Sequence, residues 1–304
     1  MLAHPLPLPL VTDRHATSFT MSHLRPSSSS SATTTTTPAL QLPRTLARPA
    51  FDVISRAALA AAAPELWAED VPDAFIRHAL GAQAPTMRAG IALLAGLPQA
   101  LPLAGLPARV TVPIRPVDVD GVEVALPTHT LAVSEAGKGS DGSASVFPIH
   151  SVLLAAHCTK LAPLPAPSPD SESDTVALPL LPLPLPSVPA FAIVHHWLYN
   201  PRLDAVLAAL LPGLPAAFLT RLADADPLPA LEAALADRPT LHVLAAHLCA
   251  ASNSSPAALL RRAAHVRALW QTLVALGICD AGLWAALDVA WEVMLGALNI
   301  ALVQ

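Results

Sequence analysis

The spacing of hydrophobic and polar positions changes several times along the chain, and each change predicts a different kind of element. From residue 52 to about residue 80, alanine-rich apolar runs alternate with prolines at positions 64 and 72. Proline is favoured at the first position of a helix, so this stretch predicts short helices. We expect their packing residues to be Trp67, Val71, Phe75 and Leu80.

Residues 109–133, RVTVPIRPVDVDGVEVALPTHTLAV, alternate β-branched with polar residues, which is typical of strands. Asp120-Gly121 lies between two such runs and predicts a β-hairpin. A loop rich in glycine and serine follows, and residues 146–158, VFPIHSVLLAAHC, then predict a strand that enters a short apolar helix. In Thr175 to Pro186, leucine alternates with proline. Because proline donates no ladder hydrogen bond, we expect an edge strand or a polyproline segment there.

The second half of the chain predicts helices. Residues 191–199 and 202–211 form two apolar runs broken at Pro201, and the chain after Pro212 is mostly helical. Ser255 followed by Pro256 predicts a capped start, and Gly277 an end. Asp280 can cap the last helix, which is apolar on nearly all sides and must therefore be buried or docked on a partner.

Composition and pattern together predict an α+β fold that is mostly helical. Apolar residues make up 53% of the 304-residue chain and aromatic residues only 4%, so alanine and leucine must fill the core. Serine and threonine runs within residues 1–48 predict a disordered, low-complexity N-terminus. We divide the rest into a short helical segment at 49–107, a sheet-plus-helices core at 108–211 and a helical C-terminal region at 212–304.

Charge and cysteine content exclude several functions. A net charge of -5 without a basic cluster does not predict direct nucleic-acid binding. Three well-separated cysteines form no CxxC pair and predict neither a disulfide scaffold nor a structural zinc site. Prolines interrupt the only apolar run of the first twenty residues, and charged residues interrupt the apolar C-terminus. We therefore expect a soluble intracellular protein, in the nucleus or the cytoplasm, with no membrane partner.

The motifs that suggest chemistry do not form a site. Gly137, Gly139 and Gly142 match GxGxxG, but the segment continues as a loop into a strand instead of opening a helix. His150-Ser151 lacks the turn of a serine nucleophile. The histidine and cysteine groups offer at most two ligands on one helix face, and zinc needs three or four. We expect no catalytic residue, metal, cofactor or small-molecule substrate.

Two segments of the sequence resemble segments of a known fold. Residues 147–156, FPIHSVLLAA, resemble the strand-to-helix signature of BTB/POZ domains, and residues 191–200, FAIVHHWLYN, resemble a helix of the same fold. With the leucine and proline tract between them, the pattern is most similar to clampless-type regulatory proteins of basidiomycete fungi. The resemblance implies a BTB/POZ-like core at 108–211 and marks the fold by five residues: Phe147, His150, Phe191, Trp197 and Tyr199.

The same resemblance implies a regulator of sexual development, required for clamp cell formation and dikaryotic growth, that binds other proteins and possibly itself. Tentative partner-facing residues are Val152, Leu153 and Leu154 on the short helix, and Trp284 and Trp291 on the last helix. One alternative is a self-assembling helical scaffold without distinct partners. A second is an enzyme of unknown chemistry.

Overall fold

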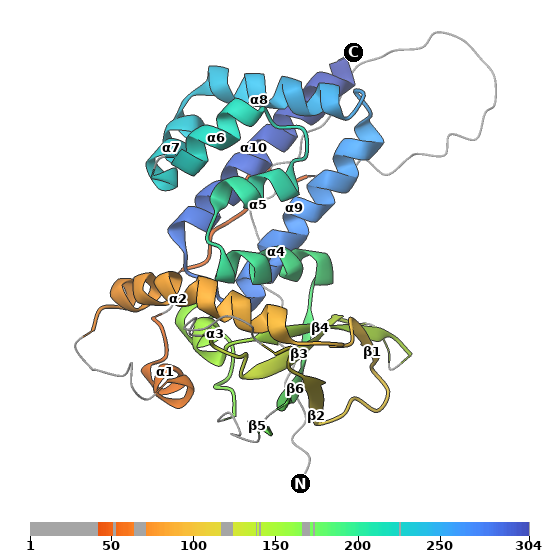
Figure 1. Ribbon diagram of the computed structural model, residues 1–304. Coiled ribbons are helices and arrows are strands. Elements are labelled where there is room, and N and C mark those ends of the chain that lie inside the picture. Colours follow the sequence, from red (N-terminus) through yellow and green to blue (C-terminus); the bar gives the residue numbers. More distant parts are fainter. Residues whose placement is uncertain are drawn as a thin grey trace, which may run out of the picture. The chain divides into compact units, whose positions relative to one another are not determined.

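The computed structural model describes residues 42–50, 53–63, 71–116, 124–137, 139, 141–165, 171–172, 174–224 and 226–303 (Figure 1). The chain divides into two units, Met1–Leu46 and Ala47–Gln304. The described helices and strands all lie in the second unit. The predicted low-complexity tract falls almost wholly outside the described residues, as do the expected Trp67 helix and the Asp120-Gly121 turn.

The first half of the second unit contains a mixed sheet. Its strands are β1 (Ala100–Pro102), β2 (Arg109–Pro113), β3 (His129–Glu135), β4 (Ser143–Ile149), β5 (Ser171–Glu172) and β6 (Thr175–Leu185). They are arranged in the order β1-β4-β3-β6-β2, with β5 paired to β6. All pairs are antiparallel except β3 with β6, which run parallel.

The proline-rich strand β6 is not the edge strand or polyproline segment that the sequence predicts, because it lies between β3 and β2. It changes partner along its length: β2 pairs with residues 175–179 and β3 with residues 180–185. Leu180 N donates toward the β2 side, to Ala108 O at 2.9 Å, and Leu185 O accepts from Ala136 N on the β3 side. Since successive residues direct their backbone groups to opposite sides, Pro182 and Pro184 point away from β3, where no ladder donor is required.

The strands on either side of the Asp120-Gly121 turn, which itself lies outside the described residues, do not pair with each other. β2 pairs with β6, whereas β3 pairs with β4 and β6. Two pairs of consecutive strands are antiparallel, β5 with β6 and β3 with β4, and the latter pair is joined through the loop rich in glycine and serine. Gly137 has a φ of 89° in this loop, a conformation that suits glycine.

Three helices contact one another beside the sheet: α2 (Asp73–Leu93), α3 (Ser151–His157) and α4 (Val188–Tyr199). α4 contacts β3, α2 contacts both α3 and α4, and α1 (Arg56–Ala62) contacts α3 (Figure 1). α2 continues through Pro85, so this stretch is one longer helix rather than a short one. Phe75 is 62% exposed and not the packing residue we expected. The buried stripe of α2 runs through Ile76, Leu80, Ala84 and Met87. Ile76 is about 100° around the helix axis from Phe75.

The second half of the unit is helical. Its helices are α5 (Leu203–Leu210), α6 (Ala216–Asp224), α7 (Pro227–Ala236), α8 (Arg238–Ala251), α9 (Pro256–Leu276) and α10 (Ala281–Val303). α10 contacts α5, α7, α8 and α9, so this long apolar helix is the centre of the bundle (Figure 1). The predicted caps form: Ser255 accepts from Ala258 N, Asp280 accepts from Leu283 N, and Gly277 adopts a left-handed conformation.

The length and composition of α10 would also permit it to cross a membrane, and α8 with α9, bent by 119° at their junction, passes the same test as a pair. Buried residues of α10 point in every direction around its axis, including Leu287, Val289, Ala290 and Trp291. Contacts with four helices account for this burial without a lipid environment. The arrangement as a whole confirms the expected α+β, mostly helical fold class.

Candidate functional site

The two segments that carry the family resemblance meet where β4 ends and α3 begins. His150 is the N-cap residue of α3, and Tyr199 is the last residue of α4. The Tyr199 hydroxyl oxygen accepts from the His150 backbone N at 3.0 Å and lies 2.9 Å from His150 Nδ1. Nε2 of the same ring lies 3.1 Å from the carbonyl oxygen of Ala125.

These contacts define the protonation state of His150. A carbonyl oxygen can only accept, so Nε2 carries the proton that it donates to Ala125. Nδ1 is then the acceptor, and the Tyr199 hydroxyl donates to it. Burial lowers the pKa of His150 to about 4 and raises that of Tyr199. His150 is therefore a neutral, internally satisfied side chain at neutral pH rather than a proton shuttle.

A cluster of aromatic rings extends this contact along α4. Phe147 of β4 packs edge-on against Phe191, with ring centroids 5.0 Å apart. The His195 ring lies 5.3 Å from Phe147 and 5.2 Å from Tyr199, and its Nε2 donates to Pro148 O at 2.8 Å. Burial also lowers the pKa of His195. Phe191, His195 and Tyr199 are spaced four residues apart and therefore lie on one face of α4. This face packs against the end of β4.

Gly90 of α2 permits the close approach of the backbone that His150 binds. A Cβ atom at Gly90 would lie 1.8 Å from the carbonyl oxygen of Ala125. Only a residue without a side chain leaves room for this carbonyl, so Gly90 fixes the position of the His150 acceptor.

The fifth fold-marking residue lies at the other end of α3. Trp197 packs edge-on against His157, with ring centroids 5.1 Å apart. Burial, followed by the nearby positive charge of Arg77, lowers the pKa of His157 to about 4. Arg77 also donates to Cys279 Sγ at 3.2 Å. Residues from α2, α3, α4 and the loop before α10 thus meet here.

The structure brings the five fold-marking residues together in two adjoining clusters, but it places the tentative partner-facing residues in the interior. The exposed fractions are 8% for Val152, 1% for Leu153, 2% for Leu154, 0% for Trp284 and 2% for Trp291. The first three belong to a helix that contacts α1 and α2, and the tryptophans belong to the central helix of the bundle. These side chains offer no surface to a partner, since neighbouring helices already cover them.

Three contributors were not expected from the sequence: His195, Ala125 and Gly90. The spacing of Phe191, His195 and Tyr199 on one helix face is a signal that could have indicated His195. The other two contribute only through tertiary contacts of the backbone. The histidine and cysteine groups considered for zinc form no cluster of three or more ligands among the residues that the structure describes.

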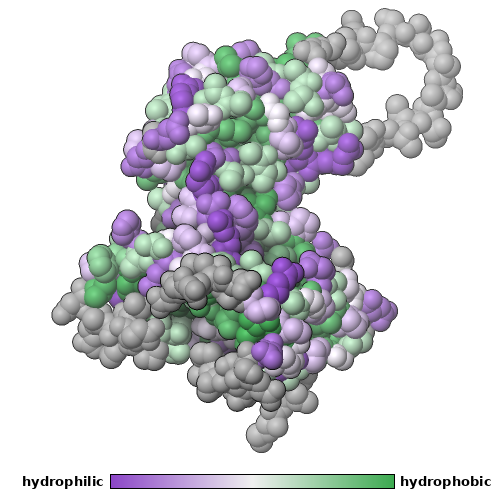
Figure 2. Space-filling model, viewed as in Figure 1, coloured by the Kyte–Doolittle hydropathy of each residue, from purple (hydrophilic) through white to green (hydrophobic). Residues whose placement is uncertain are grey.

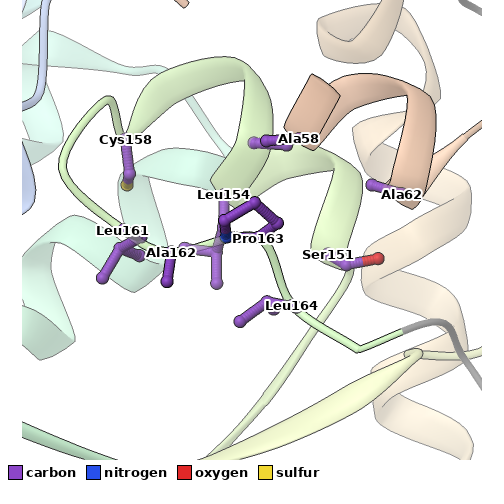
Figure 3. Close-up of a pocket in the computed structure, with 10 residues that line it drawn as sticks. Ala58, Ala62, Ser151, Leu154, Cys158, Leu161, Ala162, Pro163 and Leu164 are labelled. Carbon is purple, nitrogen blue, oxygen red and sulfur yellow. The ribbon is translucent and has the colours of Figure 1, made fainter. Parts of the chain in front are cut away.

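Two hollows of the described surface lie beside α3 and α4. The first lies between α1, α3 and residues 161–164, has a volume of about 10 Å³ and has room for about one water molecule. Figure 3 shows Ser151, Leu154 and Cys158 around it. Burial raises the pKa of the Cys158 thiol, which does not favour a reactive thiolate.

The second hollow is an open groove of about 220 Å³ between α4 and α5. Its walls are apolar apart from one histidine and consist of Ala192, Ile193, His196, Ala205, Val206 and Ala209. On α4 the groove is lined by Ala192, Ile193 and His196, which lie beside the buried face that holds Phe191 and Tyr199. Ala192 and His196 are exposed.

The chain is an α+β protein whose buried polar side chains at the end of β4 bond to one another and to backbone carbonyls, and whose groove between α4 and α5 is lined mostly by apolar residues. Family comparisons agree with the expected resemblance. Residues 49–186 match the clampless protein 1 N-terminal domain, and residues 204–304 match the clampless protein 1 C-terminal domain. The chain belongs to the clampless protein 1 family. No curated protein and no solved structure matches it significantly.

The two matched domains meet at α4. The first ends one residue after β6, and the second begins at the second residue of α5. α4 lies between them and contacts α2 and β3 on one side and α5 and α9 on the other. The likeness of residues 108–211 to a BTB/POZ domain stays a prediction, since no solved structure matches the chain.

Proposed function

We propose that this clampless-type protein is a non-enzymatic regulator that acts by binding other proteins. The observation that carries the proposal is the contrast between its interior and its surface. Three side chains with shifted pKa near the sheet, His150, His195 and Tyr199, bond to one another or to backbone carbonyls. His150 and Tyr199 are buried and His195 is partly buried. An active site would instead present such groups to a substrate.

The open groove between α4 and α5 is the contact surface that we propose. None of its lining residues is acidic, lysine or arginine. A charged occupant would lose its hydration without gaining a counter-charge, so the groove suits an uncharged apolar side chain from the helix of a partner protein. His196 on its wall is exposed and can add one hydrogen bond.

The biological role that we propose follows the family. The protein would act inside the cell, in the nucleus or cytoplasm, during sexual development, where clamp cells form and the dikaryon grows. Its partners would be proteins and not nucleic acid, membrane or a small molecule. The net charge of -5 supports this choice against nucleic acid.

The proposal can be tested by placing a charge in the groove. Ala192 and Ala209 are exposed residues on its two walls, and Ala208 is an exposed neighbour on α5 outside it. We expect Ala192→Arg and Ala209→Arg, but not Ala208→Arg, to lose proteins that the parent chain captures from mating mycelium. Proteins lost in this way are then purified and their affinity for the parent and each variant is measured by titration calorimetry.

The same variants can be tested in cells. In a basidiomycete whose own clampless gene is replaced by each variant, we expect Ala208→Arg to form clamp cells as the parent does and the groove variants to form fewer. If purified partners bind the groove variants and the parent equally, the groove is not the contact surface. If no direct protein partner is found for a chain that supports clamp formation, the binding function itself is refuted.

A further inference from the structure

The exposed face of α9 is positively charged, and the helix itself has no acidic residue to neutralise that charge. The helix contains Arg261, Arg262, His265 and Arg267 and no acidic residue, in a chain whose net charge is -5. Arg262 donates to Pro212 O at 3.0 Å. Among the residues that the structure describes, the recorded ion pairs involve neither Arg261 nor Arg267, and both side chains are exposed.

Helix geometry places these two arginines on either side of a ridge of small residues. At 100° per residue, Ala264 is midway between Arg261 and Arg267, about 60° from each. Ala257 lies seven residues before Ala264, about two helical turns earlier, so it is close to the same line along the helix. It is also exposed. The buried stripe of α9, which includes Leu259, Ala263 and Val266, faces the opposite way. A second helix could therefore approach the ridge closely, between two positive charges.

The complementary pattern occurs on α7 of the same chain. Asp226 caps this helix, and Glu232 lies six residues later, which is the separation of the two arginines on α9. Pro229 lies three residues from each in the sequence and is exposed, and Ala236, seven residues after Pro229, is on the same side of the helix and also exposed. The segment from Asp226 to Asp237 contains three acidic residues and no basic one.

The two faces cannot meet within one molecule. α10 contacts both helices, and α7 and α9 lie on opposite flanks of it (Figure 1). Figure 2 shows hydrophilic residues gathered over both flanks. Each face is therefore available to the opposite face of another copy.

We propose that the α9 face of one molecule binds the α7 face of a second copy, in a head-to-tail contact. Because the two faces differ, each added copy leaves one face of each kind free, and the contact extends an open chain instead of closing a two-fold dimer. Exposed ion pairs are individually weak and are screened by salt, so association is weak, depends on concentration and decreases with ionic strength. This inference does not depend on the proposed groove.

Sedimentation velocity of the full chain over a range of concentrations tests the contact. We expect association at about 50 mM salt and about a tenfold weaker association at about 500 mM. Arg261→Glu with Arg267→Glu should weaken it by about tenfold or more, and so should Asp226→Asn with Glu232→Arg. Asparagine is chosen at position 226 because it keeps the helix cap. The control, Arg88→Glu with Arg115→Glu, makes the same charge change at exposed positions outside α9 and should have no comparable effect.

The decisive arm mixes the two reversed proteins. The α9 variant carries acidic residues on both faces, and the α7 variant carries a neutral asparagine and an arginine in place of its two acids. Each should therefore fail to associate alone, and the mixture should associate again. If the parent chain stays monomeric at low salt, the proposal is wrong. It is also wrong if the α9 variant associates as strongly as the parent. Loss in both variants without recovery in the mixture shows that the arginines bind something other than α7, which also overturns it. Thermal unfolding at the parent temperature confirms that each variant is folded.

Discussion

Gly81 and Gly90 lie on the same helix, α2, yet the same substitution should change stability in opposite directions. A Cβ at Gly81 would have no other atom within 4 Å, whereas a Cβ at Gly90 would lie 1.8 Å from Ala125 O. Alanine is a better helix former than glycine by about 1 kcal/mol. We therefore expect Gly81→Ala to raise the free energy of unfolding by roughly 0.5–1 kcal/mol.

Gly90→Ala has the same gain in helix propensity, but two larger costs oppose it. Ala125 or the helix must move by more than an ångström, and overpacking of this kind costs about 1–3 kcal/mol. The same movement breaks the 3.1 Å hydrogen bond from His150 Nε2, and an unsatisfied buried donor costs a further 1–3 kcal/mol or so. The net expectation is a loss of roughly 2–4 kcal/mol in the free energy of unfolding.

Urea denaturation followed by circular dichroism measures both changes, with Gly81→Ala as the matched control. A lower midpoint for Gly90→Ala at an unchanged slope would show a loss of stability rather than a change in the unfolded state. If Gly90→Ala is as stable as Gly81→Ala, the close approach of α2 to Ala125 does not exist and the account of the His150 acceptor is wrong.

Three further predictions concern the same clusters. Tyr199→Phe removes the partner of both the His150 backbone N and Nδ1 and should lower the free energy of unfolding by roughly 2–4 kcal/mol; an unchanged urea midpoint would refute the network. His150 and His157 have pKa values lowered to about 4, so the unfolded chain binds more protons between pH 4 and 6.5. Stability is then full above about pH 6.5 and decreases as the pH falls toward 4, by up to about 3 kcal/mol per histidine; urea midpoints that are equal at pH 7 and pH 5 would contradict this. Because α4 contacts both halves of the unit, amide exchange in β3 and α10 should report one common opening, and clearly separate opening free energies would show that the halves unfold independently.

Local sequence signals predicted where helices and strands lie better than they predicted which strands pair and which helix faces are buried. Ser255, Gly277 and Asp280 end or begin helices through contacts within a few residues, so the sequence indicates them directly. Phe75 was assigned to the wrong face because the sequence alone did not show that the buried stripe of α2 runs through Ile76 and its neighbours.

The pairing of strands could not be predicted in the same way. β2 pairs with β6, which follows it by more than sixty residues, so a local turn signal such as Asp120-Gly121 could not indicate the partner of β2. The prolines of β6 indicate only that some ladder donors are absent. They do not show that the strand exchanges β2 for β3 at Leu180, which is what makes Pro182 and Pro184 acceptable inside the sheet.

The candidate site shows the same division between local and tertiary information. The resemblance placed Phe147, His150, Phe191 and Tyr199 in two motifs, and the structure joins them through hydrogen bonds and ring contacts. The residues that the resemblance marks most clearly are therefore buried, apart from Phe147, which is partly buried.

This has a consequence for where function is located in the molecule. α4 separates the two domains matched by the family models, and its buried face is fixed to β4 by the aromatic cluster. Exposed residues beside that face form a wall of the open groove with α5, the first helix of the second domain. A rigidly held helix can present a surface in one geometry, whereas a flexible connector would lose that geometry. The buried histidine and tyrosine then matter to binding by holding α4 in place, and the groove in turn depends on both domains.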